Sequence, residues 1–93
     1  MQIDQLFRPR SEVAVREISD GAVLVDMKSG GCFELNRVGF EIWKLLEPKA
    51  SVTNICGALA GHYPVAHETL VADVQNLIDS LMRAGLVEAS GPR

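Results

Sequence analysis

Two cysteines and two histidines are the residues of this sequence whose side chains most readily take part in chemistry. Cys32, Cys56, His62 and His67 suggest a thiolate nucleophile with an imidazole base. Such a pair needs the base within hydrogen-bond reach of the thiol and a third group that orients the base. No spacing in the sequence places either histidine beside Cys32. We therefore expect no catalytic residue and a protein that is not an enzyme.

The same residues do not make a recognisable metal site. Structural zinc sites gather four Cys or His ligands, and His62 and His67 lack a third ligand at a suitable spacing. Two cysteines form no disulfide framework, and Gly30-Gly31 is too short to cradle a phosphate. We expect no metal and no cofactor. Because neither a signal peptide nor a membrane-spanning run appears, we expect a cytoplasmic protein with no membrane partner.

Length and charge narrow the class of function. The chain has 93 residues, which fits one domain, and 47% of them are hydrophobic. It carries 9 basic and 12 acidic residues, for a formal net charge of −3. Nucleic-acid binding draws its affinity mainly from Lys and Arg on phosphates. The composition therefore opposes a nucleic-acid partner.

The first half of the chain predicts a small antiparallel sheet. Residues 1–11 lack periodicity and are expected to form an N-terminal arm, anchored by Leu6 and Phe7. Three β-rich runs follow at 13–18, 22–27 and 31–35. Asp20-Gly21 is a strong hairpin signal, and a glycine-containing turn joins the second run to the third. We predict a three-stranded meander.

The period then changes from two to 3.6, which predicts three helices. Asn36 caps the first helix, Ser51 caps the second over 52–63, and the third runs from near His67 to Gly85. A short closing strand at 86–88 and a frayed tail at 89–93 complete the chain. The expected fold is α+β and winged helix-turn-helix-like, with one domain over 12–88.

The outer edge of the third strand lacks the usual protection against strand pairing. Natural edges carry Lys, Pro or a bulge, or are covered, whereas Gly31 to Leu35 has only Glu34. Its backbone groups could accept an added strand from another chain. The alternative is that the arm or residues 86–88 cover this edge.

The third helix has an unusually wide apolar face. Two lines span roughly 140° of its surface; the first is Leu70, Val74, Leu77 and Leu81, and the second is Val71, Ile78 and Met82. The first line suffices to dock the helix, so the second could floor a groove beside the strand. The alternative is that both lines are core. An open edge beside a groove predicts an extended, partly apolar peptide as ligand.

Taken together, these residues resemble the PqqD-like family, the stand-alone form of the RiPP precursor recognition element. The resemblance covers about residues 7–88. It is carried by the order and spacing of several short segments: Ala22-Val23-Leu24-Val25, Phe33-Glu34-Leu35-Asn36, Val38-Gly39, Ile42-Trp43, Val52-Thr53-Asn54-Ile55, Leu59, Tyr63, Val71-Ala72-Asp73-Val74, Leu77-Ile78, Leu81 and Gly85-Leu86-Val87.

The resemblance implies a winged-helix-like protein that binds the leader segment of a ribosomally made precursor peptide. The leader would add to the third strand against the third helix and be presented to a modifying enzyme, such as a radical-SAM protein, or to a leader peptidase. Members serve pyrroloquinoline quinone, lasso peptide and other pathways. Arg8-Pro9-Arg10 only partly matches the arginine-rich opening expected of the quinone pathway, so the pathway stays open.

Carried over by position, the implied contact residues lie on the third strand and the third helix. They are Gly31, Cys32, Phe33, Glu34, Leu35, Val71, Asp73, Val74, Gln75, Ile78 and Met82. Asp73 either pairs with a basic leader residue or serves the structure, since it flanks the stripe on the side opposite Val71.

Two other functions stay open at this point. A winged-helix DNA-binding regulator would use Gln75, Asn76 and Arg83 of the third helix, but the acidic residues of the same helix oppose it. A structural dimerisation module would use the third-strand edge to form a homodimer.

Overall fold

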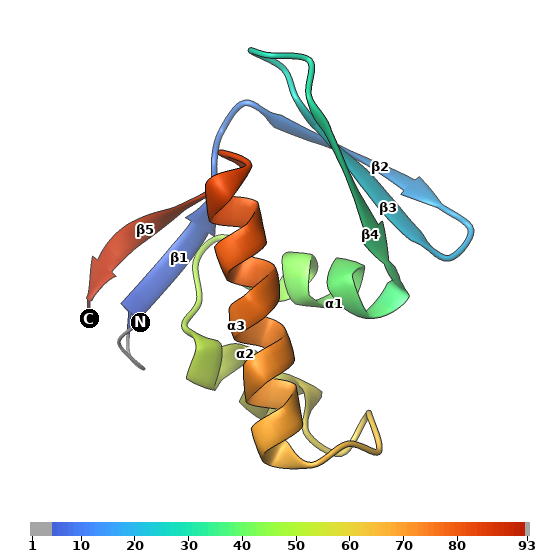
Figure 1. Ribbon diagram of the computed structural model, residues 1–93. Helices are drawn as coiled ribbons and strands as arrows, with labels where there is room; N and C mark the ends of the chain where they lie inside the picture. Colours follow the sequence, from blue (N-terminus) through green and yellow to red (C-terminus); the bar gives the residue numbers. More distant parts are fainter. Residues whose placement is uncertain (1–4, 93) are drawn as a thin grey trace.

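The computed structural model describes residues 5–92, which form eight regular elements in the order β-β-β-β-α-α-α-β (Figure 1). The strands are β1 (Gln5–Pro9), β2 (Val13–Ile18), β3 (Gly21–Asp26), β4 (Cys32–Asn36) and β5 (Val87–Pro92). The helices are α1 (Arg37–Leu46), α2 (Val52–Leu59) and α3 (His67–Arg83).

The predicted meander and the three helices that follow it are confirmed. The strands β2, β3 and β4 form one antiparallel sheet in that order. The β2–β3 hairpin pairs Ile18 with Gly21 across a two-residue turn. Gly21 is needed there, because a Cβ at this position would collide with the carbonyl oxygen of Leu35 on β4. The short turn and the close approach together fix the register of the sheet.

The two ends of the described chain differ from the expectation. Residues 5–9 of the expected arm form β1, and β5 continues through most of the expected frayed tail, as far as Pro92. These two strands pair with each other in a separate antiparallel sheet. Residues 1–4 and 93 lie outside the described residues.

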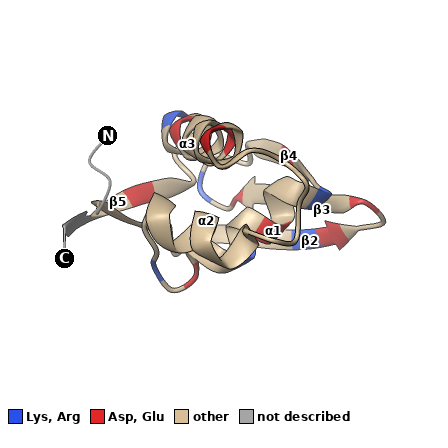
Figure 2. Cartoon of the chain, turned by 90° about the horizontal axis from the view of Figure 1, so that it is seen from below, with Lys and Arg blue, Asp and Glu red and all other residues tan. Residues whose placement is uncertain are grey.

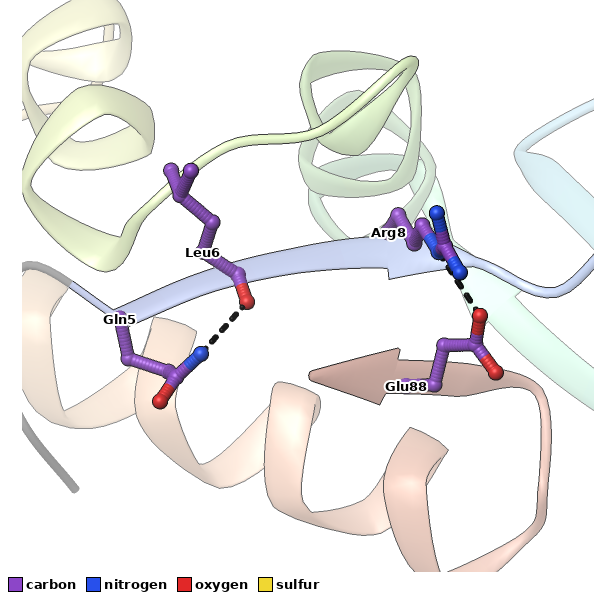
Figure 3. Close-up of polar contacts among 4 residues, drawn as sticks. All are labelled: Gln5, Leu6, Arg8 and Glu88. Carbon is purple, nitrogen blue, oxygen red and sulfur yellow. Dashed lines mark hydrogen bonds and ion pairs between the residues drawn. The ribbon is translucent and has the colours of Figure 1, made fainter. Parts of the chain in front are cut away.

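Contacts on both sides hold β1 in place. Arg8 Nε lies 2.7 Å from Glu88 Oε2 across the strand pair, as Figure 3 shows. On its other side, Phe7 donates to the Ala50 carbonyl at 2.8 Å and accepts from the Ala50 N–H at 2.9 Å. The side chains of Leu6 and Phe7 are buried, so the expected anchoring role of these two residues is confirmed.

Side-chain caps begin α1 and α2 where the sequence predicts. The Asn36 carboxamide oxygen accepts from the Gly39 N–H at 2.8 Å, and Ser51 and Asn54 form a reciprocal capping box. The second helix ends at Leu59, earlier than the expected 63, and Gly61 follows with φ +86° in the left-handed region. Tyr63 nevertheless packs against the core.

The core lies where the helices meet each other and one face of the three-stranded sheet. It includes Leu24 of β3, Leu35 of β4, Trp43 of α1, Ile55 of α2 and Ile78 of α3. The first helix contacts both β3 and β4, while α3 lies against α2 and β5. Among the described residues, no helix has the length and apolar character needed to span a bilayer.

Candidate functional site: a groove between β4 and α3

One edge of β4 has no partner strand among residues 5–92. The strand pairs with β3 on one side only, as the last strand of its sheet. The segments that the sequence offered as covers, the arm and residues 86–88, pair with each other in the β1–β5 sheet instead. The edge of β4 is therefore available to another chain.

The hydrogen-bond pattern shows which backbone groups this edge presents. Asp26 N–H donates to the Gly31 carbonyl at 2.8 Å, which fixes the phase of the β3–β4 ladder. Backbone groups of an antiparallel strand point alternately to its two sides. With the observed register, those of Phe33 and Leu35 face β3, and those of Cys32 and Glu34 face the open edge. An added strand would therefore find donors and acceptors at Cys32 and Glu34.

A cavity of about 480 Å³ lies beside this edge. Three elements line it: β4, the first turns of α1, and the middle of α3. The lining residues are Phe33, Glu34, Leu35, Asn36, Val38, Gly39, Ile42, Asp73 and Leu77. We call this cavity and the adjoining edge of β4 the β4–α3 groove.

The two faces of β4 contribute different side chains to the groove, apolar on one face and charged on the other. Leu35 is buried and Phe33 half-buried, because both side chains lie on the face that packs on the helices. Successive side chains of a strand alternate between faces, so Glu34 lies on the opposite face, where it is exposed. On α3, Leu77 is half-buried and Asp73 exposed. The groove thus has an apolar floor and two carboxylates at its margins.

The structure brings together only part of the implied contact set. Phe33, Glu34, Leu35 and Asp73 line the groove, while Gly31 and Cys32 are exposed along or just before the strand. By contrast, Val74 and Ile78 are both 0% exposed and belong to the core. They support the groove from beneath and offer no surface to a ligand.

The remaining implied residues of α3 lie away from the groove. Val71 and Gln75 line a second cavity, of about 270 Å³, between α2 and α3. Met82 is 38% exposed and lies outside both linings. Of the second apolar line, Val71 therefore faces α2, Ile78 belongs to the core and Met82 is exposed. The helix meets the groove through Asp73 and Leu77.

Five groove residues were absent from the implied contact set. Leu77 was expected on the first apolar line of α3, and Asn36 was identified as a helix cap. Val38, Gly39 and Ile42 appeared only in the segments that carry the family resemblance. A usable signal existed: Leu77 stands four residues after Asp73, which places both on one helix face. The contribution of α1 follows from the Asn36 cap, which begins the helix directly at the end of β4.

The cysteines and histidines are not gathered into a reactive cluster. Cys32 is exposed on β4, and Cys56 is buried on α2. Cys56 and His67 both line the cavity between α2 and α3, where burial raises the pKa of the Cys56 thiol and disfavours the thiolate. Within the described part of the chain, no three His, Cys, Asp or Glu side chains are grouped so as to hold a metal ion.

Comparisons with known proteins show which family and which solved structures this chain resembles. A family model described as "Coenzyme PQQ synthesis protein D (PqqD)" matches residues 21–87. The solved structure "TbiB1 in Complex with the TbiA(beta) Leader Peptide" is 30% identical with a TM-score of 0.79, covering 87% of this chain and 94% of that chain. A second, "Lasso peptide synthetase B1 complexed with the leader peptide", is 29% identical with a TM-score of 0.75, covering 88% and 96%. A comparison with curated proteins gave no match.

Proposed function

The chain belongs to the PqqD family, and from this premise we propose that it binds the leader segment of a ribosomally synthesised precursor peptide in the β4–α3 groove. Both similar structures are complexes with leader peptides, which supports this class of ligand. The observation that carries the proposal is the unpaired edge of β4 beside a cavity of about 480 Å³.

The proposed mode of binding is β-strand addition. Main-chain hydrogen bonds to Cys32 and Glu34 supply affinity that depends little on the peptide's sequence. Alternate side chains of the added strand then point into the cavity, where Leu77 of α3, Val38 of α1 and Phe33 of β4 offer apolar contact. The peptide is held in an extended conformation, and specificity comes from every second side chain of the peptide, because only these enter the cavity.

The proposed role of the bound state is presentation. Holding only the leader leaves the rest of the precursor free for an enzyme, such as a radical-SAM protein or a leader peptidase. DNA binding is disfavoured by charge, because α3 carries Glu68, Asp73 and Asp79 against a single basic residue, Arg83 (Figure 2). Such a surface would repel phosphates.

Amide hydrogen exchange tests the proposal directly. The neighbourhood of the gene is first searched for a small precursor gene, and the leader segment that it encodes is made as a synthetic peptide. Saturation should protect the Cys32 and Glu34 amides, because their N–H groups face the open edge, and leave the Val15 amide on β2 unchanged. Protection at Val15, or at residues lining the α2–α3 cavity instead, would contradict the assignment.

A further inference from the structure

Building on the proposed function, we propose that the docked leader segment is basic, with Lys or Arg side chains that pair with Glu34 and Asp73 and an apolar side chain that packs on Leu77. The groove lining contains these two carboxylates and no Lys or Arg. Within residues 5–92, neither carboxylate takes part in an ion pair or a side-chain hydrogen bond. Both are exposed, so an incoming cation meets them without displacing an internal partner.

Two cations that the chain and the strand register place near β4, Arg37 and Arg16, do not pair with these carboxylates. Arg37, which follows β4 directly, donates to the Ser19 carbonyl in the β2–β3 turn at 3.5 Å. Arg16 shares the outer sheet face with Glu34, but Val23 of β3 stands between them in the register. Two strand spacings of about 4.8 Å each separate their backbones. The groove therefore keeps its negative charge.

The backbone register assigns each cation of the peptide to a face. A residue opposite Glu34 in the added strand projects to the same outer face as Glu34. Its two neighbours in the peptide project to the other face, toward α3. A basic residue opposite Glu34 can therefore pair with that carboxylate while the flanking residues contact the helix.

The spacing on α3 matches the spacing on a strand. Asp73 and Leu77 are one helical turn apart, about 6 Å along the axis. Side chains at i and i+2 of an extended peptide are about 6.6 Å apart. One of the two flanking residues can thus lie over Leu77 while the other reaches Asp73. The inferred segment has a basic residue facing Glu34, with an apolar and a second basic residue on either side of it.

Selection from a random peptide library tests this inference without a known ligand. The probe is an mRNA-display library of twelve-residue peptides, selected on the full-length protein and on the double variant Glu34→Gln/Asp73→Asn. On the unchanged protein, enriched peptides should carry two adjacent Lys or Arg residues, one next to the apolar anchor and the other two positions away from it. On the double variant, the apolar anchor should persist and the enrichment of Lys and Arg should disappear.

Affinity measurements give the contribution of the two ion pairs to peptide binding. A selected peptide should bind the double variant about three- to tenfold more weakly than the unchanged protein, since two partly exposed ion pairs are lost. The difference should shrink at 500 mM NaCl because salt screens these pairs. The peptide's own Lys/Arg→Gln analogue should reproduce the loss and bind both proteins equally.

The outcomes separate this inference from the proposed function on which it rests. Selected peptides that lose affinity for Cys32→Pro, yet show no preference for Lys or Arg, would overturn the inferred charge and leave the groove assignment standing. A library that yields no peptide sensitive to Cys32→Pro would contradict the groove assignment, and the charge inference with it.

Discussion

The three-stranded sheet has two free edges among the described residues, and the β4 edge adjoins the cavity of the β4–α3 groove. On β4, the outward backbone groups are those of Cys32 and Glu34, with α3 and α1 beside them. On β2, the bond from Met27 N–H to the Glu12 carbonyl at 2.8 Å sets the ladder phase. The backbone N–H and C=O groups that point outward on β2 are therefore those of Val13, Val15 and Glu17.

The surroundings of the two edges differ more than their backbones do. Val15 and Ile18 of β2 are 42% and 41% exposed, and Arg16 and Glu17 place charges in the middle of the strand. Such charges discourage unwanted pairing. An unpaired backbone is thus common to both edges, while β4 also has the cavity of about 480 Å³ and its half-buried apolar side chains beside it. The two edges therefore differ in the helices beside them more than in their backbones, and this difference is the reason that we propose β4, and not β2, as the site of strand addition.

The largest expected effect comes from placing a charge in the groove. Leu77→Glu should weaken leader binding by about a hundredfold or more, because an unpaired carboxylate would face the apolar anchor of the peptide. The measurement is fluorescence anisotropy with a labelled leader. Met82→Glu, on the same helix but outside the groove lining, is the matched control and should bind within about twofold of the unchanged protein. Equal losses of leader affinity in both variants would contradict the assignment of Leu77 and α3 to the peptide site.

A proline at each edge compares the two edges directly. Cys32→Pro removes an outward-facing donor at the first residue of β4, a position where a strand tolerates proline. We expect leader binding to weaken about tenfold, since the peptide loses one hydrogen bond and leaves its carbonyl unpaired. Val15→Pro makes the same change at β2 and should leave binding unchanged. Isothermal titration calorimetry measures both, and a loss at Val15→Pro alone would reverse the assignment of the edges.

Substitution at the α2–α3 cavity sharpens the boundary of the site. Gln75 lines that cavity and not the groove, so Gln75→Ala should change leader affinity by less than about twofold. Surface plasmon resonance with an immobilised leader measures this. A larger loss, with the thermal midpoint unchanged, would extend the peptide site around the helix to the face that the sequence resemblance implied.

The smallest expected effect is on stability, and it comes from the turn that leads into β4. Asp26 accepts from the Lys28 N–H at 2.9 Å and from Ser29 Oγ at 3.1 Å, and the backbone hydrogen bond is the main cause that lowers the pKa of Asp26 below 3.8. A lowered folded-state pKa stabilises the fold above the unfolded pKa, and this contribution is lost as the pH falls through the folded pKa.

Asp26→Asn should therefore lower the thermal midpoint slightly at pH 6 and have little effect at the acid end, below the folded pKa. Thermal scans followed by the fluorescence of Trp43, the single tryptophan, measure this. A difference that grows as the pH falls would contradict the sign derived from the hydrogen bonds.

Turn and cap signals in the sequence predicted much of the fold, but they did not predict the pairing of strands that lie far apart in the chain. Asp20-Gly21, Asn36 and Ser51 each act on their immediate neighbours, so the hairpin and the helix starts could be read from the sequence. The β1–β5 pair joins segments some eighty residues apart, as the Arg8–Glu88 contact shows. Neither segment alternates clearly between apolar and polar residues, so neither predicts its partner.

The sequence predicted a groove beside β4, but it assigned the floor of that groove to the wrong apolar line of α3. Periodicity gave the width of the apolar face of α3, but a wide stripe does not tell which margin turns toward β4. The structure turns Asp73 and Leu77 toward it and buries Ile78. That orientation depends on how α2 and the β1–β5 pair seat the helix, which is a property of the assembled core.

The pairing of β1 with β5 also determines where the molecule can be attached to something else. It brings residues 5 and 92 side by side, with α3 standing between them and the three-stranded sheet (Figure 1). A linker to a sensor surface, a fluorophore or a second protein could leave from either end without obstructing the groove. Tethering at both ends at once would also keep the protein in one orientation, with the three-stranded sheet turned away from the points of attachment.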